Sequence, residues 1–350
     1  KGVADVPTVN PYLKKRIQRK EYTPAEFVEG ILKGNITILS QAVTLVESSK
    51  YEHQQVAQEI IEKCLPHAGK SVRIGITGVP GAGKSTSIDA FGMHLIGQGR
   101  KLAVLAIDPS SERSKGSILG DKTRMEALSR EKNAFIRPSP SAGSLGGVAR
   151  KTRETIVLCE AAGFDTVFVE TVGVGQSETA VHSMVDFFLL IQLAGTGDEL
   201  QGIKRGIMEM ADGIIINKAD GDNLEKAKLA AAQFRNALHL FPAPESSWSP
   251  KVLTYSGYYN LGIKEIWDMV GEYMEFTQKN GYFNYKRNEQ AKYWMYESIN
   301  DTLRETFYHN PAVEKMLNFT EQQVLNNEIS SFVAAKRMMD LFLENLSAKK

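Results

Sequence analysis

The sequence has little cysteine, little excess charge and no long apolar run. Its 350 residues include only Cys64 and Cys159, too few for a disulfide framework or a cysteine-built zinc site. The 42 lysines and arginines nearly balance 41 aspartates and glutamates, and this net charge of +1 argues against general nucleic-acid binding. The longest apolar candidate, Val185–Ala194, is shorter than the roughly 18 residues of a membrane helix, so no membrane insertion is expected. A reducing, cytoplasmic location is predicted, with a removed organelle leader left open.

The chain divides into three regions of different texture. Residues 1–70 carry apolar residues at helical spacing and predict a helical N-terminal arm, and residues 277–350 predict a helical C-terminal extension. Residues 71–276 alternate helical stretches with short apolar runs, which predicts an α/β fold with a mostly parallel central sheet flanked by helices. The apolar runs are Val72–Thr77, Leu102–Ile107, Thr166–Glu170, Phe187–Leu193, Gly213–Asn217 and Val252–Tyr255.

A phosphate-binding loop is the strongest motif. Residues 78–85, GVPGAGKS, fit G-x-x-x-x-G-K-[ST] between a predicted strand and a predicted helix. Glycines permit a tight loop with inward backbone N–H groups, Lys84 supplies charge to the β- and γ-phosphates and thereby assists catalysis, and Ser85 offers a hydroxyl to Mg²⁺. The expected nucleotide contacts are Gly78, Pro80, Gly81, Ala82, Gly83, Lys84, Ser85 and Thr86.

A second motif predicts which base is bound. Residues 213–220 read as a buried strand ending in N-K-x-D, formed by Asn217, Lys218 and Asp220. A carboxylate at this position can accept hydrogen bonds from N1–H and the exocyclic amine of guanine, whereas adenine N1 is itself an acceptor. GTP and GDP, rather than adenine nucleotides, are therefore expected. Residues 256–257, Ser256 and Gly257, either complete the base pocket or form a plain turn.

Carboxylates follow two of the predicted strands. Asp108 and Glu170 would both face the phosphates if the strands are parallel, because ligands bind at the carboxyl ends of such strands. They are either Mg²⁺ ligands, which suits a cation that prefers oxygen, or simple helix caps and solvated strand ends. Gly173 would bring a backbone N–H near the γ-phosphate. The polar segment 116–125, which contains Asp121, is either a mobile switch or a solvated loop.

Six sequence motifs follow one another along the chain in this order: GVPGAGKST, AIDPSS, GSILGDKTRM, FVETVGVGQSE, GTGDELQGIK and NKAD. Together they strongly resemble the MeaB/ArgK/MMAA family of GTPases, over nearly the whole chain. The resemblance implies a GTPase domain of the SIMIBI class, usually in a homodimer. It also implies a chaperone that gates cobalamin loading and protects adenosylcobalamin-dependent methylmalonyl-CoA mutase, with slow GTP hydrolysis as the timer.

Matching motif to motif, the resemblance implies a role for each segment. Asp108, Asp121 and Glu170 would surround Mg²⁺, and residues 173–178 would form a switch in which Gln176 is a candidate for positioning water. Segment 196–204 would signal to the mutase, and the helical extension would supply the dimer contact.

Two other functions compete with this interpretation. Some family members have carried the label of an ATPase or kinase of lysine/arginine/ornithine transport, which is the alternative function and which the N-K-A-D motif disfavours. A nickel-insertion GTPase would share the nucleotide chemistry. It would also be expected to have a segment rich in cysteine and histidine, and the sequence shows none.

Overall fold

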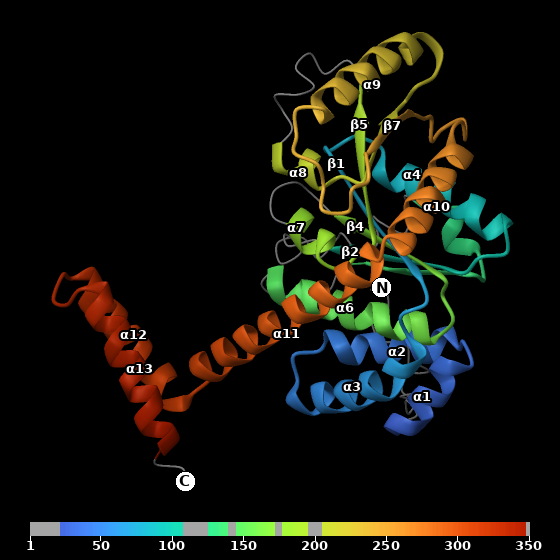
Figure 1. Ribbon diagram of the computed structural model, residues 1–350. Coiled ribbons are helices and arrows are strands. Elements are labelled where there is room, and N and C mark those ends of the chain that lie inside the picture. Colours follow the sequence, from blue (N-terminus) through green and yellow to red (C-terminus); the bar gives the residue numbers. More distant parts are fainter. Residues whose placement is uncertain (1–21, 108–124, 139–144, 172–176, 195–204, 348–350) are drawn as a thin grey trace, which may run out of the picture.

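The structure is a computed structural model that describes residues 22–107, 125–138, 145–171, 177–194 and 205–347. Within these residues, seven parallel strands form one sheet in the order β3-β2-β4-β1-β5-β6-β7 (Figure 1). The strands are β1 (Val72–Gly78), β2 (Leu102–Ile107), β3 (Ala134–Arg137), β4 (Thr166–Thr171), β5 (Phe187–Leu193), β6 (Gly213–Asn217) and β7 (Lys251–Thr254). The predicted α/β fold with a parallel central sheet is confirmed.

Six strands coincide with the predicted apolar runs to within one residue at either end. The seventh, β3, was not predicted. It has four residues, of which only Phe135 is buried, and it pairs on one side only, with β2. A short edge strand with one buried side chain carries no pattern that separates it from a loop.

Helices cover both faces of the sheet because alternate strand residues point to opposite sides. One hydrophobic core packs α4 and α10 against side chains such as Ile76 and Phe168. A second core packs α6, α7 and the N-terminal helices against Val167 and Phe188 on the opposite face. A third core holds α8 and α9 against β6. These helices are α4 (Lys84–Gly97), α6 (Leu145–Ala161), α7 (Ser177–His182), α8 (Arg205–Met210), α9 (Leu224–Leu238) and α10 (Ile263–Lys279).

The N-terminal helices pack as a layer on α6, beside the sheet (Figure 1). Thr23 and Glu26 form a reciprocal capping box at the start of the first helix, and Asn35 caps the second. Apolar side chains of this layer, including Ile31 and Leu39, are completely buried. The elements are α1 (Pro24–Leu32), α2 (Ile36–Glu47), α3 (Tyr51–Cys64) and the short 3-10 helix η2 (Leu65–His67).

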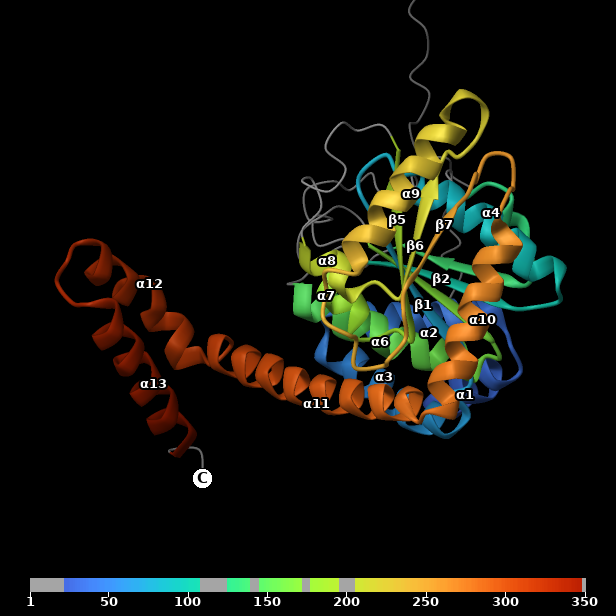
Figure 2. The same cartoon turned by 45° about the horizontal axis from the view of Figure 1, so that its top comes forward.

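The C-terminal helices leave the body of the molecule. The first part of the long helix α11 (Tyr282–Tyr308) packs on the body through Trp294, whereas its distal end projects outward (Figures 1 and 2). It carries a hairpin of α12 (Pro311–Leu325) and α13 (Ser331–Ser347) that stands away from the sheet (Figure 2). The division at residues 70 and 276 stays a prediction. None of the described helices is both long enough and apolar enough to cross a membrane.

Candidate nucleotide site

The loop between β1 and α4 lies at the carboxyl end of a central strand, where a parallel sheet presents ligands. Two of its glycines are required by geometry. A Cβ on Gly78 would lie 2.2 Å from the carbonyl oxygen of Ile191 on β5, and Gly78 has a φ of 157°. Gly83 has a φ of 84°, and its Cβ would lie 2.6 Å from Nδ2 of Asn217. Only glycine lets the loop lie this close to β5 and β6.

Lys84 and Ser85 begin α4, where unpaired backbone N–H groups favour a phosphate. The Lys84 ammonium folds back and donates a 2.8 Å hydrogen bond to the carbonyl of Gly78. Burial lowers the pKa of Lys84, and the negative charges of Glu170 and Glu178 oppose that shift. A lysine held among buried carboxylates at a helix start is well placed to meet an incoming anion.

The other predicted contact residues differ in exposure. Ala82 is completely buried. Pro80, Gly81 and Thr86 are exposed at the tip of the loop and in the first turn of α4.

One carboxylate meets the start of α4. Glu170 lies on β4, which pairs with β1 in the register Ile76 to Glu170, and its side chain is buried. Its Oε1 accepts a 3.4 Å hydrogen bond from Oγ of Ser85. Two hard oxygen atoms at this spacing suit Mg²⁺, which keeps several waters and needs few protein ligands. In the described part of the chain, no group of three or more His, Cys, Asp or Glu side chains could hold a metal ion.

Asn217 connects the phosphate loop to the base-recognition segment. It ends β6 and is buried. Its Nδ2 donates a 2.8 Å hydrogen bond to the Ala82 carbonyl, while its Oδ1 accepts from the backbone N–H groups of Lys218 at 2.7 Å and Gly257 at 3.1 Å. One amide side chain therefore fixes the relative position of three segments that are far apart in sequence.

Asp220 and Ser256 form a hydrogen-bonded pair at the edge of this site. The buried Ser256 hydroxyl donates to Oδ2 of the partly exposed Asp220. Between Asn217 and Asp220, Lys218 is exposed with a φ of 59°, a conformation that turns the chain sharply after β6. Ser256 and Gly257 both lie beside the N-K-x-D segment. Ser256 bonds to Asp220, and Gly257 bonds to Asn217.

Four predicted site residues lie outside the described residues: Asp108, Asp121, Gly173 and Gln176. The segments 116–124 and 196–204 also lie outside them. Sequence reasoning did not single out Ser87, whose buried hydroxyl lies 3.5 Å from Nδ2 of Asn217. Its only signal was its position, one helical turn after Lys84 and hence on the same face of α4.

The chain matches a known family along most of its length. A family model described as methylmalonyl-CoA mutase-associated GTPase MeaB matches residues 39–312. The chain is 50% identical over 312 residues to a putative GTPase of Caulobacter vibrioides, covering 89% of this chain and 95% of the relative. It is 44% identical over 320 residues to GTPase ArgK of Escherichia coli, with 91% and 97% covered.

A mouse relative and a solved structure extend this similarity. The mouse protein, named methylmalonic aciduria type A homolog, mitochondrial, is 45% identical over 323 residues, which covers 89% of this chain and 78% of the relative. A crystal structure described as that of an LAO/AO transport system kinase superposes with a TM-score of 0.72 at 38% identity, covering 93% of this chain and 99% of the other. The chain thus belongs to the MeaB/ArgK/MMAA family, and it is a GTPase.

Proposed function

We propose that this GTPase acts as a chaperone of adenosylcobalamin-dependent methylmalonyl-CoA mutase. In this role it gates the loading of the cobalamin cofactor and protects the mutase, with GTP binding and slow hydrolysis as the timer. The client follows from the description of the matching family and from no residue of the site. The nucleotide chemistry rests on the residues themselves.

The observation that carries the nucleotide assignment is the bond between Asn217 and the Ala82 carbonyl, 2.8 Å long. It holds the end of the base-recognition strand against the phosphate loop, so that one guanine nucleotide can span both. In this pose the carboxylate of Asp220 accepts the two guanine N–H donors, and the loop around Lys84 receives the phosphates. Lys218, Ser256 and Gly257 would shape the base pocket.

Hydrolysis of GTP needs charge neutralisation and an oriented water rather than covalent chemistry. Lys84 would neutralise charge on the β- and γ-phosphates, and the helix start of α4 would add its positive end. Ser85 and Glu170 would hold Mg²⁺, which supplies further positive charge to the phosphates. Asp108 and Asp121 are proposed as further oxygen donors around the ion. Gly173 and Gln176 are proposed to meet the γ-phosphate and the attacking water.

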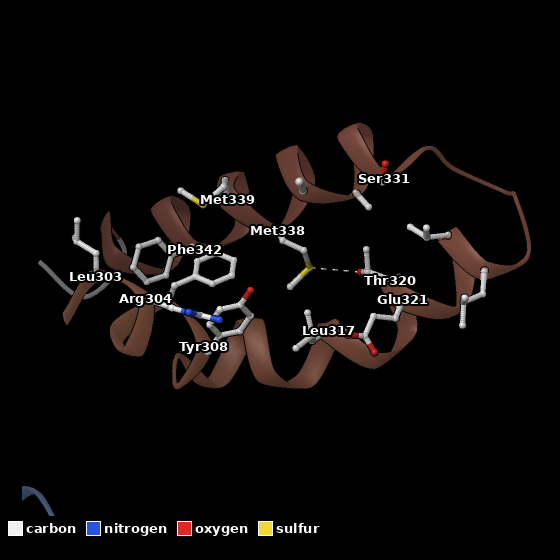
Figure 3. Close-up of a pocket in the computed structure, with 15 residues that line it drawn as sticks. Leu303, Arg304, Tyr308, Leu317, Thr320, Glu321, Ser331, Met338, Met339 and Phe342 are labelled. Carbon is white, nitrogen blue, oxygen red and sulfur yellow. Dashed lines mark hydrogen bonds between the residues drawn. The ribbon is translucent and has the colours of Figure 1, made fainter. Parts of the chain in front are cut away.

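We further propose a homodimer formed through the α12–α13 hairpin. Val313, Met338 and Phe342 form its small buried core, and a cavity of about 760 Å³ opens between its two helices and the end of α11. Figure 3 shows Thr320 and Met338 meeting within this cavity, where Oγ1 of Thr320 donates a 3.4 Å hydrogen bond to the sulfur. On the same hairpin, apolar side chains are exposed to water, Phe332 by 86% and Leu325 by 71%. So much exposed apolar surface on a small hairpin favours burial against a second copy.

The test of the client is direct capture. Tagged protein is loaded with GDP or with a non-hydrolysable GTP analogue and mixed with purified methylmalonyl-CoA mutase from the same source. Capture that depends on the nucleotide supports the proposal. Equal failure to capture the mutase in both states, from a preparation that still binds GDP, would remove the mutase as client and leave the GTPase intact.

The alternative is an ATPase or kinase of amino-acid transport, because the similar solved structure is described as a transport system kinase. Titration of labelled GDP and ADP separates the two, because the carboxylate of Asp220 would lack a donor opposite adenine N1. Tighter binding of ADP would favour the alternative. The cytoplasmic location stays a prediction, since the mouse relative is named as mitochondrial.

A further inference from the structure

A second polar pocket lies far from the phosphate loop. It has a volume of about 140 Å³ and is bounded by the segment after α3, by the start of β1 and by α6. Arg73 and Arg153 supply its charged walls, and Leu65 and Ile156 supply apolar ones. Because a strand rises about 3.3 Å per residue, Arg73 lies roughly 16 Å along β1 from Gly78, at the opposite end of the sheet.

The carboxylate of Glu160, which lines this pocket, accepts hydrogen bonds at all of its acceptor sites. Oε1 of Glu160 accepts from Oγ of Ser71 at 2.5 Å and from Nε of Arg73 at 2.8 Å. Its Oε2 accepts from the backbone N–H of Gly69 at 2.6 Å and from Nη2 of Arg73 at 2.9 Å. Four donors satisfy the four lone-pair sites of a carboxylate, so Glu160 has none left for another cation.

The nearby carboxylate of Asp186 accepts three hydrogen bonds. Asp186 accepts from the backbone N–H of Arg73 at 2.9 Å, and it binds Nε and Nη2 of Arg287 at 2.8 and 2.7 Å. Arg287 comes from α11 and also donates to the carbonyl of Gly69 beside the pocket. Three segments of the protein, the N-terminal arm, the sheet and the C-terminal helix, thus meet here around two carboxylates that accept seven hydrogen bonds between them.

Arg153 is the third arginine at this junction, after Arg73 and Arg287. Its Nη1 is shielded from water and has no hydrogen-bond partner among the described residues. Burial, followed by the positive charge of Arg73, lowers the pKa of Arg153 to about 10. Three arginines therefore face two carboxylates, and Arg153 is partly exposed with one buried N–H group that lacks a partner among the described residues. An unsatisfied buried donor costs about 1–3 kcal/mol.

We propose that this pocket binds a small oxyanion group, a carboxylate or a phosphate, through the guanidinium of Arg153. The planar fork of arginine matches the oxygen pair of either group. A water occupies about 30 Å³ of liquid, so the cavity has room for either ion with little solvent left. The occupant would neutralise the unpaired charge at the junction of the three segments and tie them more tightly together.

The experiment measures thermal unfolding of the full chain with GDP and Mg²⁺ at saturation, which fills the phosphate loop. Inorganic phosphate and acetate are titrated separately at constant ionic strength, with chloride as the reference salt. At ten times its Kd a ligand raises the folded-to-unfolded ratio about elevenfold. For a chain of this size, that corresponds to a rise in melting temperature of about 2 °C.

The matched variants are Arg153→Met and Arg130→Met, which remove equal charge inside and outside the pocket. Arg130 is exposed and pairs with Glu126 on its own segment. The wild type and Arg130→Met should saturate with one of the two anions, and the anion that saturates identifies the class. Arg153→Met should show no saturable rise, and without anion it should be about as stable as the wild type, because it removes a buried N–H donor that has no partner among the described residues.

Two results would overturn the proposal. One is a wild type that responds to neither anion beyond the chloride reference. The other is an Arg153→Met variant that saturates as the wild type does. If Arg153→Met does not fold, Arg153→Lys takes its place: it keeps the charge but loses the fork, so the anion should bind it at least tenfold more weakly, and unchanged binding would count against the site.

Discussion

The replacement Asp220→Asn tests base selection most sharply. The carboxylate of Asp220 is partly buried and oriented by the hydroxyl of Ser256, so it is held ready to accept two hydrogen bonds from guanine. Hydrogen bonds to a charged group contribute about 1.5–3 kcal/mol each. The amide of Asp220→Asn keeps one acceptor oxygen, so it loses one of these bonds and turns its NH₂ group towards the guanine amine, which leaves buried donors unsatisfied at about 1–3 kcal/mol each. Together these terms amount to about 3–6 kcal/mol, which corresponds to a loss of GDP affinity of roughly 10²- to 10⁴-fold.

The same change should create a new preference. The amide introduced by Asp220→Asn can donate to the C2 carbonyl of xanthine, a group that accepts where the guanine amine donates. Affinity for xanthosine diphosphate should therefore rise as affinity for GDP falls. Isothermal titration of GDP, xanthosine diphosphate and ADP, each with Mg²⁺, measures all three affinities on one preparation.

The control is Asp222→Asn, the same chemical change at an exposed position two residues away. It should leave GDP affinity within about twofold of the wild type, because an exposed surface change contributes little. The reasoning is refuted if Asp220→Asn keeps the GDP preference of the wild type, or if Asp222→Asn loses as much. Either result would remove Asp220 from the base pocket.

Three other replacements test other parts of the molecule. Lys84→Ala should abolish measurable GTP hydrolysis and greatly weaken triphosphate binding, and near-normal turnover in a phosphate-release assay would contradict its role. Burial alone would raise the pKa of Glu160, but its hydrogen bond and charge contact with Arg73 outweigh burial and hold the pKa below the usual 4.5. Its stabilisation is therefore complete above pH 4.5 and is lost as the pH falls through the lower folded-state pKa. At neutral pH, Glu160→Gln should lower the free energy of unfolding by about 3–5 kcal/mol, as for other broken buried ion pairs. In urea titrations this difference should shrink at acid pH, and a difference independent of pH would argue against the ion pair. Phe332→Glu should convert a dimer to a monomer in light scattering, whereas Lys336→Glu on the same helix should not; a monomeric wild type would refute the hairpin interface.

The structure brings the phosphate loop and the N-K-x-D segment together, and their roles in nucleotide binding stay predictions. The phosphate loop and the N-K-x-D segment are local patterns, and their strand and helix context follows from apolar runs that are short, bounded and rich in β-branched residues. Gly78 and Gly83 could be read as loop glycines, but the reason for each lies in Ile191 and Asn217, on strands distant in sequence. The predicted ligands Asp108 and Asp121 lie outside the described residues and stay predictions.

By itself the sequence determined the class of fold, the nucleotide motifs and the strands buried on both faces, because each of these is written in a stretch of a few consecutive residues. Tertiary structure alone decided the rest. The edge strand β3 has too few buried side chains to show a pattern, and the bond from Asn217 to Ala82 joins residues 135 positions apart. Nη1 of Arg153 has no partner among the described residues because four other donors already occupy the carboxylate of Glu160, and those donors come from segments distant in sequence. Such facts depend on which distant side chains packing brings together, and no local pattern records them.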